Sequence, residues 1–196
     1  MNFDAVILAG GKSSRMGRDK AFVDFRGAPL IAHAINRLQP QVSMLAIAAN
    51  SDPARFATFH APVLADRDET RPGPLAGVAA GLLFARQQGC AAIVTTPCDA
   101  PFAPRDLVQR LLSAGGANAP AVAASERGVE PLFGLWPVKA LADVEAALAR
   151  RDTAVWRLLE ALNAARVEIP VAGPEDWRLN LNTPAELAAA EHSPGI

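Results

Sequence analysis

The stretch from Gly10 to Lys20 combines two adjacent glycines with a dense set of cationic side chains. Four cations stand against one carboxylate, so these residues carry a charge of +3 in a chain whose formal net charge is −1. The cations are Lys12, Arg15, Arg18 and Lys20, and the carboxylate is Asp19. Adjacent glycines such as Gly10 and Gly11 let backbone amides approach a bulky anion closely. This combination predicts binding of a phosphate chain.

Two better-known phosphate motifs do not match this loop. A P-loop needs a glycine five residues before Gly11, where Val6 stands, and the dinucleotide fingerprint needs a second glycine where Lys12 stands. The residues alone leave a second interpretation open, in which the loop is a turn after a strand and its cations merely face water.

Carboxylate and amide side chains follow three apolar runs farther along the chain. They are Asn50 after Met44–Ala48, Asp66 after Pro62–Ala65, and Asp99 after Ala91–Thr96. Ligands of open α/β sheets bind beyond the carboxyl ends of the strands. Because Mg²⁺ prefers one or two carboxylates together with phosphate oxygens and water, Asp99 is a candidate Mg²⁺ ligand. The alternative is that Asp99 is only a turn residue between Pro97 and Pro101.

The elements that must position these side chains are short apolar runs that alternate with helical patterns. The runs are Ala5–Ala9, Met44–Ala48, Pro62–Ala65, Ala91–Thr96, Ala119–Ala124 and Leu132–Trp136. Most lack polar alternation, which is typical of strands buried on both faces of a parallel sheet. Helices are expected over Leu75–Gln88, Arg105–Ser113 and around the stripe of Leu141, Val144 and Leu148. The pattern predicts an α/β fold: a Rossmann-like, doubly wound, mostly parallel sheet with helices on both faces, in a single domain over residues 1–196.

Three sequence signals concern the ends of helices. Gly77, early in the helix after Pro74, permits the close approach of a ligand or of neighbouring backbone; a tight turn into a packed helix is the alternative. Thr153 is expected to cap a helix that carries Val155. Thr183 and Glu186 have the spacing of a capping box, with proline at the first helical position.

Composition excludes several classes of function. The formal net charge of −1 argues against binding of nucleic-acid polymer or anionic membrane, and the longest apolar runs are far too short to span a bilayer. Cys90 and Cys98 show neither zinc nor disulfide spacing and fit a reducing compartment, so we expect a cytoplasmic protein.

The loop from Leu8 to Lys20 resembles the signature loop of nucleotidyltransferases, and most of all that of the molybdenum cofactor guanylyltransferases. The resemblance implies that the nucleotide is contacted by Leu8, Ala9, Gly10 and Gly11. It also implies that Arg15 and Lys20 hold the triphosphate. Related enzymes that use CTP typically read Leu-Ala-Ala-Gly here, so Gly10 favours guanine.

Later segments extend the resemblance to Pro184. Pro97-Cys98-Asp99-Ala100-Pro101 is similar to the family's metal-binding segment, and Gly73–Gly77 to a segment beside the base. Asp66 and Asn50 resemble nucleotide-contacting residues, although the family's asparagine could instead align with Ala48. Asn180 and Asn182 are similar to an Asn-x-Asn-Thr-Pro segment, which implies contact with the second substrate; helix capping by Asn182 is the alternative. Glu130 departs from the His or Gln that usually precedes proline.

The implied reaction joins GTP to molybdenum-bound molybdopterin, giving the guanine dinucleotide cofactor and pyrophosphate. It implies Mg²⁺ as cofactor, catalytic roles for Arg15, Lys20 and Asp99, and molybdenum cofactor biosynthesis proteins or molybdoenzyme chaperones as protein partners. The alternatives are a cytidylyltransferase, a sugar-1-phosphate nucleotidyltransferase and a non-catalytic nucleotide-binding subunit.

Overall fold

A seven-stranded sheet is the centre of the computed structural model, which describes residues 3–10, 19–66, 73–171, 175–181 and 183–191. The strand order is β5-β4-β1-β6-β8-β7-β9. The pairs β5–β4, β4–β1, β1–β6 and β7–β9 are parallel, whereas β8 runs antiparallel to both β6 and β7. The strands are β1 (Asp4–Leu8), β4 (Met44–Ala48), β5 (Val63–Leu64), β6 (Ala92–Pro97), β7 (Ala121–Ser125), β8 (Gly128–Pro137) and β9 (Ala165–Glu168). The predicted doubly wound, mostly parallel sheet is therefore confirmed.

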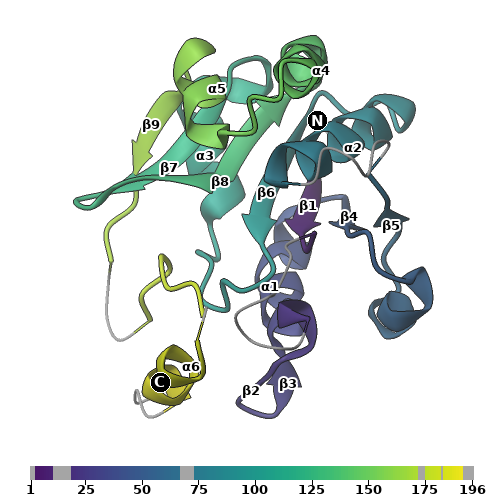
Figure 1. Cartoon of the computed structure of the whole chain (residues 1–196). Helices are drawn as coiled ribbons and strands as arrows, with labels where there is room; N and C mark the ends of the chain where they lie inside the picture. Colours follow the sequence, from purple (N-terminus) through teal and green to yellow (C-terminus); the bar gives the residue numbers. More distant parts are fainter. Residues whose placement is uncertain (1–2, 11–18, 67–72, 172–174, 182, 192–196) are drawn as a thin grey trace.

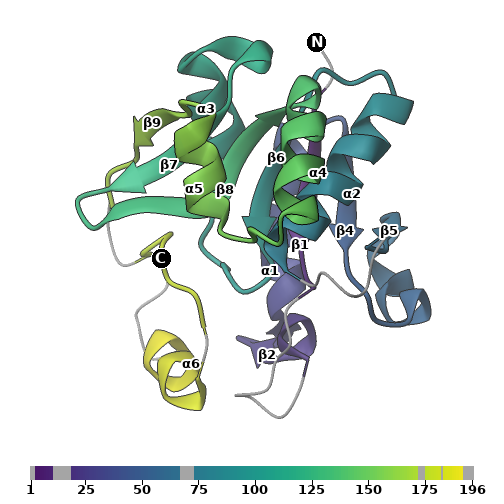
Figure 2. The same ribbon diagram turned by 45° about the horizontal axis from the view of Figure 1, so that its top comes forward.

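Helices cover both faces of the sheet. One apolar cluster contains residues of α1 (Leu30–Leu38) and α3 (Leu107–Ser113). The other contains residues of α2 (Pro74–Gln87), α4 (Leu141–Ala149) and α5 (Val155–Ala161), which lie together on one side of the sheet in Figure 2. All five residues of β1 are buried, as expected for a strand covered from both sides.

Smaller elements gather beyond the carboxyl ends of the central strands, at the bottom of Figure 1. They are the two-stranded hairpin of β2 (Asp24–Phe25) and β3 (Ala28–Pro29) and the C-terminal helix α6 (Pro184–Glu191). A third apolar cluster that includes Phe25, Phe102 and Leu181 joins them. The guanidinium of Arg26 also donates to the carbonyl of Ala190 over 2.9 Å, so the hairpin and α6 support each other.

Glycines allow α2 to lie unusually close to the sheet. A Cβ added at Gly81 would lie 2.6 Å from Cγ2 of Val6 and 2.9 Å from Cδ1 of Ile93. One added at Gly77 would lie 2.9 Å from Cδ2 of Leu8. At Gly77 the structure shows close packing of a helix on a strand, and the predicted contact of Gly77 with the nucleotide stays a prediction.

Two expectations about helix ends have different outcomes. Thr153 is not the cap of α5: the N-cap is Ala154, whose amide donates to Oδ1 of Asp152 over 3.3 Å. No side chain of the described residues caps α5, so the capping role that the sequence assigned to Thr153 is wrong. The capping box is confirmed, because the amide of Thr183 donates to Glu186 over 2.8 Å and the amide of Glu186 donates back to Oγ1 of Thr183 over 3.2 Å.

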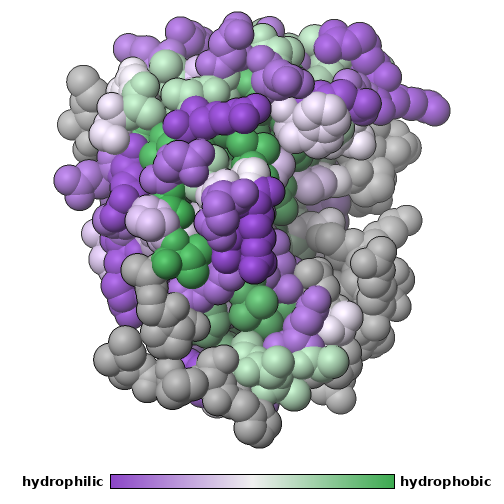
Figure 3. Space-filling view, turned by 90° about the vertical axis from the view of Figure 1, so that its left-hand side faces the viewer, coloured by the Kyte–Doolittle hydropathy of each residue, from purple (hydrophilic) through white to green (hydrophobic). Residues whose placement is uncertain are grey.

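The surface carries few large hydrophobic side chains. On the face seen in Figure 3, hydrophobic residues appear as small areas between hydrophilic ones. Among the described residues, the exposed large hydrophobics are Met44 and Trp156. No helix in the described ranges is long and apolar enough to cross a bilayer.

Candidate active site

The end of β1 lies between the ends of its two parallel neighbours. The amide of Ala9 donates to the carbonyl of Ala48 at the end of β4 over 2.8 Å, and the amide of Cys98 donates to the carbonyl of Leu8 over 3.1 Å. The chain therefore leaves the sheet at Gly10 between the segments that follow β4 and β6. Gly10 is exposed, and among the described residues an added Cβ would approach nothing closer than the carbonyl oxygen of Ala48 at 3.9 Å, which leaves this backbone open to a ligand from that side.

On the β6 side, Lys20 and Asp99 form an ion pair. The ammonium of Lys20 lies 2.5 Å from Oδ2 of Asp99, and the two side chains are only 19% and 12% exposed. This shielding from water makes the charges interact more strongly than a surface pair would. Asp99 is the second residue after β6, whereas Lys20 begins the short helix η1 (Lys20–Phe22). The structure thus brings together two residues that the sequence proposed for the same reaction.

The start of η1 is fixed by the side chain of Asp19. Its Oδ1 accepts from the amide of Ala21 over 3.3 Å, the usual role of an aspartate at a helix N-cap. The local chain direction at Lys20 therefore depends on the residue before it.

On the β4 side, Asn50 and Asp66 pair through both side-chain and backbone groups. The Asn50 amide donates to Oδ2 of Asp66 over 2.7 Å, and the backbone amide of Asp66 donates to Oδ1 of Asn50 over 2.9 Å. Burial raises the pKa of the Asp66 carboxyl above its ordinary value, and the hydrogen bond from Asn50 acts in the opposite direction. These bonds link the residues that follow β4 and β5, and they bring the two predicted side chains together.

The first turn of α2 packs over the same edge. Its N-cap is Gly73, with φ of 146°, a backbone conformation that favours glycine. Gly77 contacts Leu8 and Ala48, the last residues of β1 and β4. The start of α2 therefore lies beside the point where the chain leaves β1.

The predicted second-substrate segment borders Asp99. The amide of Leu181 donates to the carbonyl of Asp99 over 3.2 Å, and the Leu181 side chain is fully buried. Asn180 is therefore one residue away from a direct backbone bond to the Asp99 loop. Gly11, Arg15 and Asn182 lie outside the described residues, so their predicted roles stay predictions.

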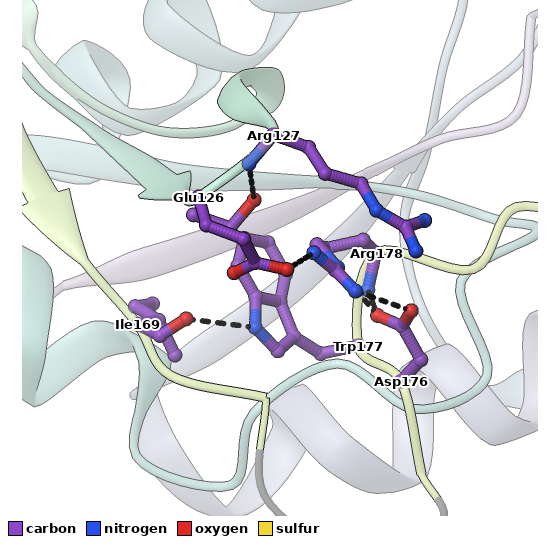
Figure 4. A network of polar contacts seen from close by, with 7 residues as sticks. Glu126, Arg127, Ile169, Asp176, Trp177 and Arg178 are labelled. Atoms are coloured by element: carbon purple, nitrogen blue, oxygen red, sulfur yellow. Dashed lines mark hydrogen bonds and ion pairs between the residues drawn. The ribbon is translucent and has the colours of Figure 1, made fainter.

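A buried arginine anchors the same C-terminal segment at its other end (Figure 4). The side chain of Arg178 is 7% exposed and donates to both oxygens of Asp176 over 2.7 Å, and it also pairs with Glu126 on the turn between β7 and β8. The indole of Trp177 donates to the carbonyl of Ile169 over 3.2 Å. These contacts hold residues 176–178 against the β7–β8 hairpin.

Glu130 lies near this network on β8. Burial raises the pKa of its carboxyl, while the charges of Arg178 and Arg127 act to lower it. The charge of Asp176 acts to raise that pKa, so the residue that departs from the family pattern is subject to charges of both signs.

Sequence reasoning missed Arg55, Arg178 and Asp176. The guanidinium of Arg55, on η3 (Pro53–Phe59), lies 2.8 Å from Oδ2 of Asp19. Arg55 pairs with a residue 36 positions away, so no local pattern could reveal this contact. An aspartate two residues before an arginine was a usable signal for the local ion pair, because an aspartate side chain at the start of a turn accepts from the backbone amide two residues on, as Asp176 does from Arg178.

Among the described residues, the site offers a metal ion the carboxylate of Asp99 but no complete set of protein ligands. The described residues contain no group of three or more His, Cys, Asp and Glu side chains that could hold a metal. Asp99 with phosphate oxygens and water matches the ligand set of Mg²⁺, which seldom relies on protein ligands alone. The site therefore fits a metal that arrives with a triphosphate.

Comparison with known proteins places this chain among nucleotidyltransferases. The family model described as "MobA-like NTP transferase domain" matches residues 5–167. A molybdenum cofactor guanylyltransferase of Cereibacter sphaeroides is 47% identical over 192 residues, which cover 97% of this chain and 96% of the relative.

Solved structures share the fold. Molybdopterin-guanine dinucleotide biosynthesis protein A of Archaeoglobus fulgidus superposes with a TM-score of 0.73 at 22% identity, with 96% of each chain covered. A protein of Mycobacterium tuberculosis solved in complex with manganese gives a TM-score of 0.70 at 17% identity, with 99% of this chain and 100% of that chain covered.

Proposed function

The chain belongs to the molybdenum cofactor guanylyltransferase family of nucleotidyltransferases, and on that premise we propose that it transfers GMP from GTP to molybdenum-bound molybdopterin. The observation that carries the proposal is the shielded pair of Lys20 and Asp99 beside the exposed backbone of Gly10. A cation, a carboxylate and an accessible glycine at the carboxyl end of a central strand are what a metal–triphosphate requires.

The proposed reaction is an in-line displacement at phosphorus. An oxygen of the acceptor's terminal phosphate forms a bond to the α-phosphorus of GTP. The bond from that phosphorus to the α–β bridging oxygen breaks, and its electron pair leaves with pyrophosphate. Because the attacking phosphate is already an anion, no general base is required, and the protein contributes positioning and charge neutralisation.

The residues divide between two sides of β1. Lys20 neutralises the triphosphate on the β6 side, together with Arg15 as the resemblance implies. Asn50 and Asp66 contact the nucleotide on the β4 side. The backbone between these two sides comes from four residues that contact the nucleotide: Leu8, Ala9, Gly10 and Gly11. Gly77 allows α2 to pack close to the sheet beside them. Asn180 and Asn182 contact the acceptor.

Asp99 would hold Mg²⁺, which supplies further charge neutralisation on the triphosphate oxygens when it is bound. The proposal places the reaction in the cytoplasm, where a reducing environment keeps thiols such as those of Cys90 and Cys98 unoxidised. The finished cofactor would pass to a chaperone or molybdoenzyme partner.

Calorimetric titration with GTP, CTP and ATP, each with and without Mg²⁺, tests the proposal together with an assay of pyrophosphate release. We expect GTP to bind most tightly, Mg²⁺ to strengthen that binding, and pyrophosphate to appear only with the acceptor present. A preference for CTP would contradict guanylyl transfer. Metal-independent binding of GTP without pyrophosphate release would instead indicate a non-catalytic nucleotide-binding subunit.

A further inference from the structure

Arg55 contacts the residues on both sides of Lys20. Its guanidinium lies 2.8 Å from Oδ2 of Asp19 and is stacked over the ring of Phe22, 4.3 Å from the ring centroid. Phe22 in turn packs against Phe56, with the ring centroids 5.0 Å apart. Helix η3 therefore holds η1 at three points, and Lys20 lies on the held segment.

The two carboxylate oxygens of Asp19 accept from different donors. Oδ1 caps η1 by accepting from the amide of Ala21, and Oδ2 pairs with Arg55. Without the guanidinium, Oδ2 of this carboxylate would lose its ion-pair partner one residue before Lys20. It would repel a triphosphate and compete with Asp99 for the lysine ammonium.

We infer that Arg55 is a positioning residue for the transfer reaction, which acts by neutralising and orienting Asp19 so that Lys20 faces Asp99 and the triphosphate. The inference rests on the proposed function. Helix η3, which carries Arg55, follows Asn50 and precedes Asp66 along the chain. The segment between Asn50 and Asp66, on the β4 side of the site, thereby also holds Lys20 on the β6 side.

The inference predicts a charge-dependent rescue. Arg55→Ala should raise the KM for GTP and lower kcat/KM by roughly tenfold, since one compensating charge is lost beside the substrate. Adding Asp19→Asn to that variant should restore kcat/KM to within about threefold of the parent, because asparagine keeps the capping oxygen and removes the repelling charge. Arg55→Lys should lie between Arg55→Ala and the parent.

A matched control exists on the far side of the molecule. Arg157 pairs with Asp152 over 2.7 Å and lies 5.7 Å from the ring centroid of Trp156, so it reproduces the arginine, aspartate and aromatic contacts without neighbouring the site. Arg157→Ala should leave kcat/KM for GTP unchanged. Its Tm should match that of Arg55→Ala within a few degrees, which would show that the kinetic loss does not come from unfolding.

Steady-state release of pyrophosphate at varied GTP, with the molybdopterin acceptor present, is the measurement. An Arg55→Ala variant with the parent's kcat/KM would overturn the inference, and so would a double variant as impaired as Arg55→Ala, since Arg55 would then not act through Asp19. Failure of the parent protein itself to release pyrophosphate would instead contradict the proposed function.

Discussion

The ammonium of Lys20 lies 2.5 Å from a carboxylate oxygen of Asp99, although 79 positions separate the two residues along the chain. Lys20 belongs to a helix that follows the glycine-rich loop, and Asp99 to the turn after β6. The pair shows that the fold itself brings the cation proposed to bind the triphosphate and the carboxylate proposed to bind the metal to one point.

Replacement of Asp99 by asparagine should lower the rate of pyrophosphate release by at least about 100-fold, because the amide removes the negative charge that would hold Mg²⁺. The folded state should survive, which a thermal melt would check. Asp106→Asn is a suitable control, since Asp106 is 47% exposed and pairs with Arg110 on the adjoining helix. Normal turnover by Asp99→Asn would remove this carboxylate from the reaction.

Asn50→Ala should weaken GTP binding by about tenfold, because it removes both hydrogen bonds that hold Asp66. Calorimetry would measure the affinity. The same variant should raise the pKa of the Asp66 carboxyl further, since burial remains and the donor that opposes it is lost. Carbon NMR of the carboxyl group reports that pKa. Asn36→Ala, at an exposed position on α1, should change neither quantity.

Alanine substitutions at Gly81 and Gly77, the two close-packed glycines of α2, should have different effects on stability and on GTP binding. Gly81→Ala should gain about 1 kcal/mol from the better helix propensity of alanine. The new Cβ would press against Val6, and overpacking of this kind costs about 1–3 kcal/mol. We therefore expect urea unfolding to show a net loss of stability. The affinity for GTP should stay within about twofold. Gly77→Ala should destabilise less and weaken GTP binding more, because it displaces Leu8 at the site. If Gly81→Ala weakened GTP binding more than Gly77→Ala did, this prediction would be wrong.

A buried carboxyl at the opposite end of β1 should make stability depend on pH. Asp4 is 1% exposed, and its Oδ2 has no hydrogen-bond partner among the residues that the structure describes. Burial raises the pKa of Asp4, and a hydrogen bond with the Cys90 thiol opposes the shift. The same contact and burial raise the pKa of that thiol to about 11.

Because the folded protein favours the protonated form of Asp4, this carboxyl costs no stability below its unfolded pKa of about 3.9. The cost develops as the pH rises from there through the folded pKa, and it is complete at neutral pH. Asp4→Asn should therefore be more stable than the parent at pH 7 and lose that advantage near pH 4 in urea unfolding. Exposed Glu145→Gln should show no such trend, and an equal trend in both variants would rule out Asp4 as the source.

Local signals predicted the scaffold well, because each depends on neighbouring residues. The apolar run Ala91–Thr96 became β6 over Ala92–Pro97, and the end of that run located Asp99 at the correct edge of the sheet. The antiparallel direction of β8 could not be predicted, since an apolar run does not reveal which way a strand points. Likewise, the pairing of Arg55 with Asp19 depends on how η3 folds back, which no spacing in the sequence encodes.

The hydrogen bond from Leu181 to the carbonyl of Asp99 has a consequence for the order in which the protein is made. Synthesis proceeds from the N-terminus, and chain segments begin to fold as they emerge. All seven strands are complete by Glu168, but Leu181 and α6 follow later. A growing chain can therefore form its sheet while the Asp99 turn still lacks its hydrogen bond from Leu181, and a segment made later than the sheet completes the surroundings of Asp99.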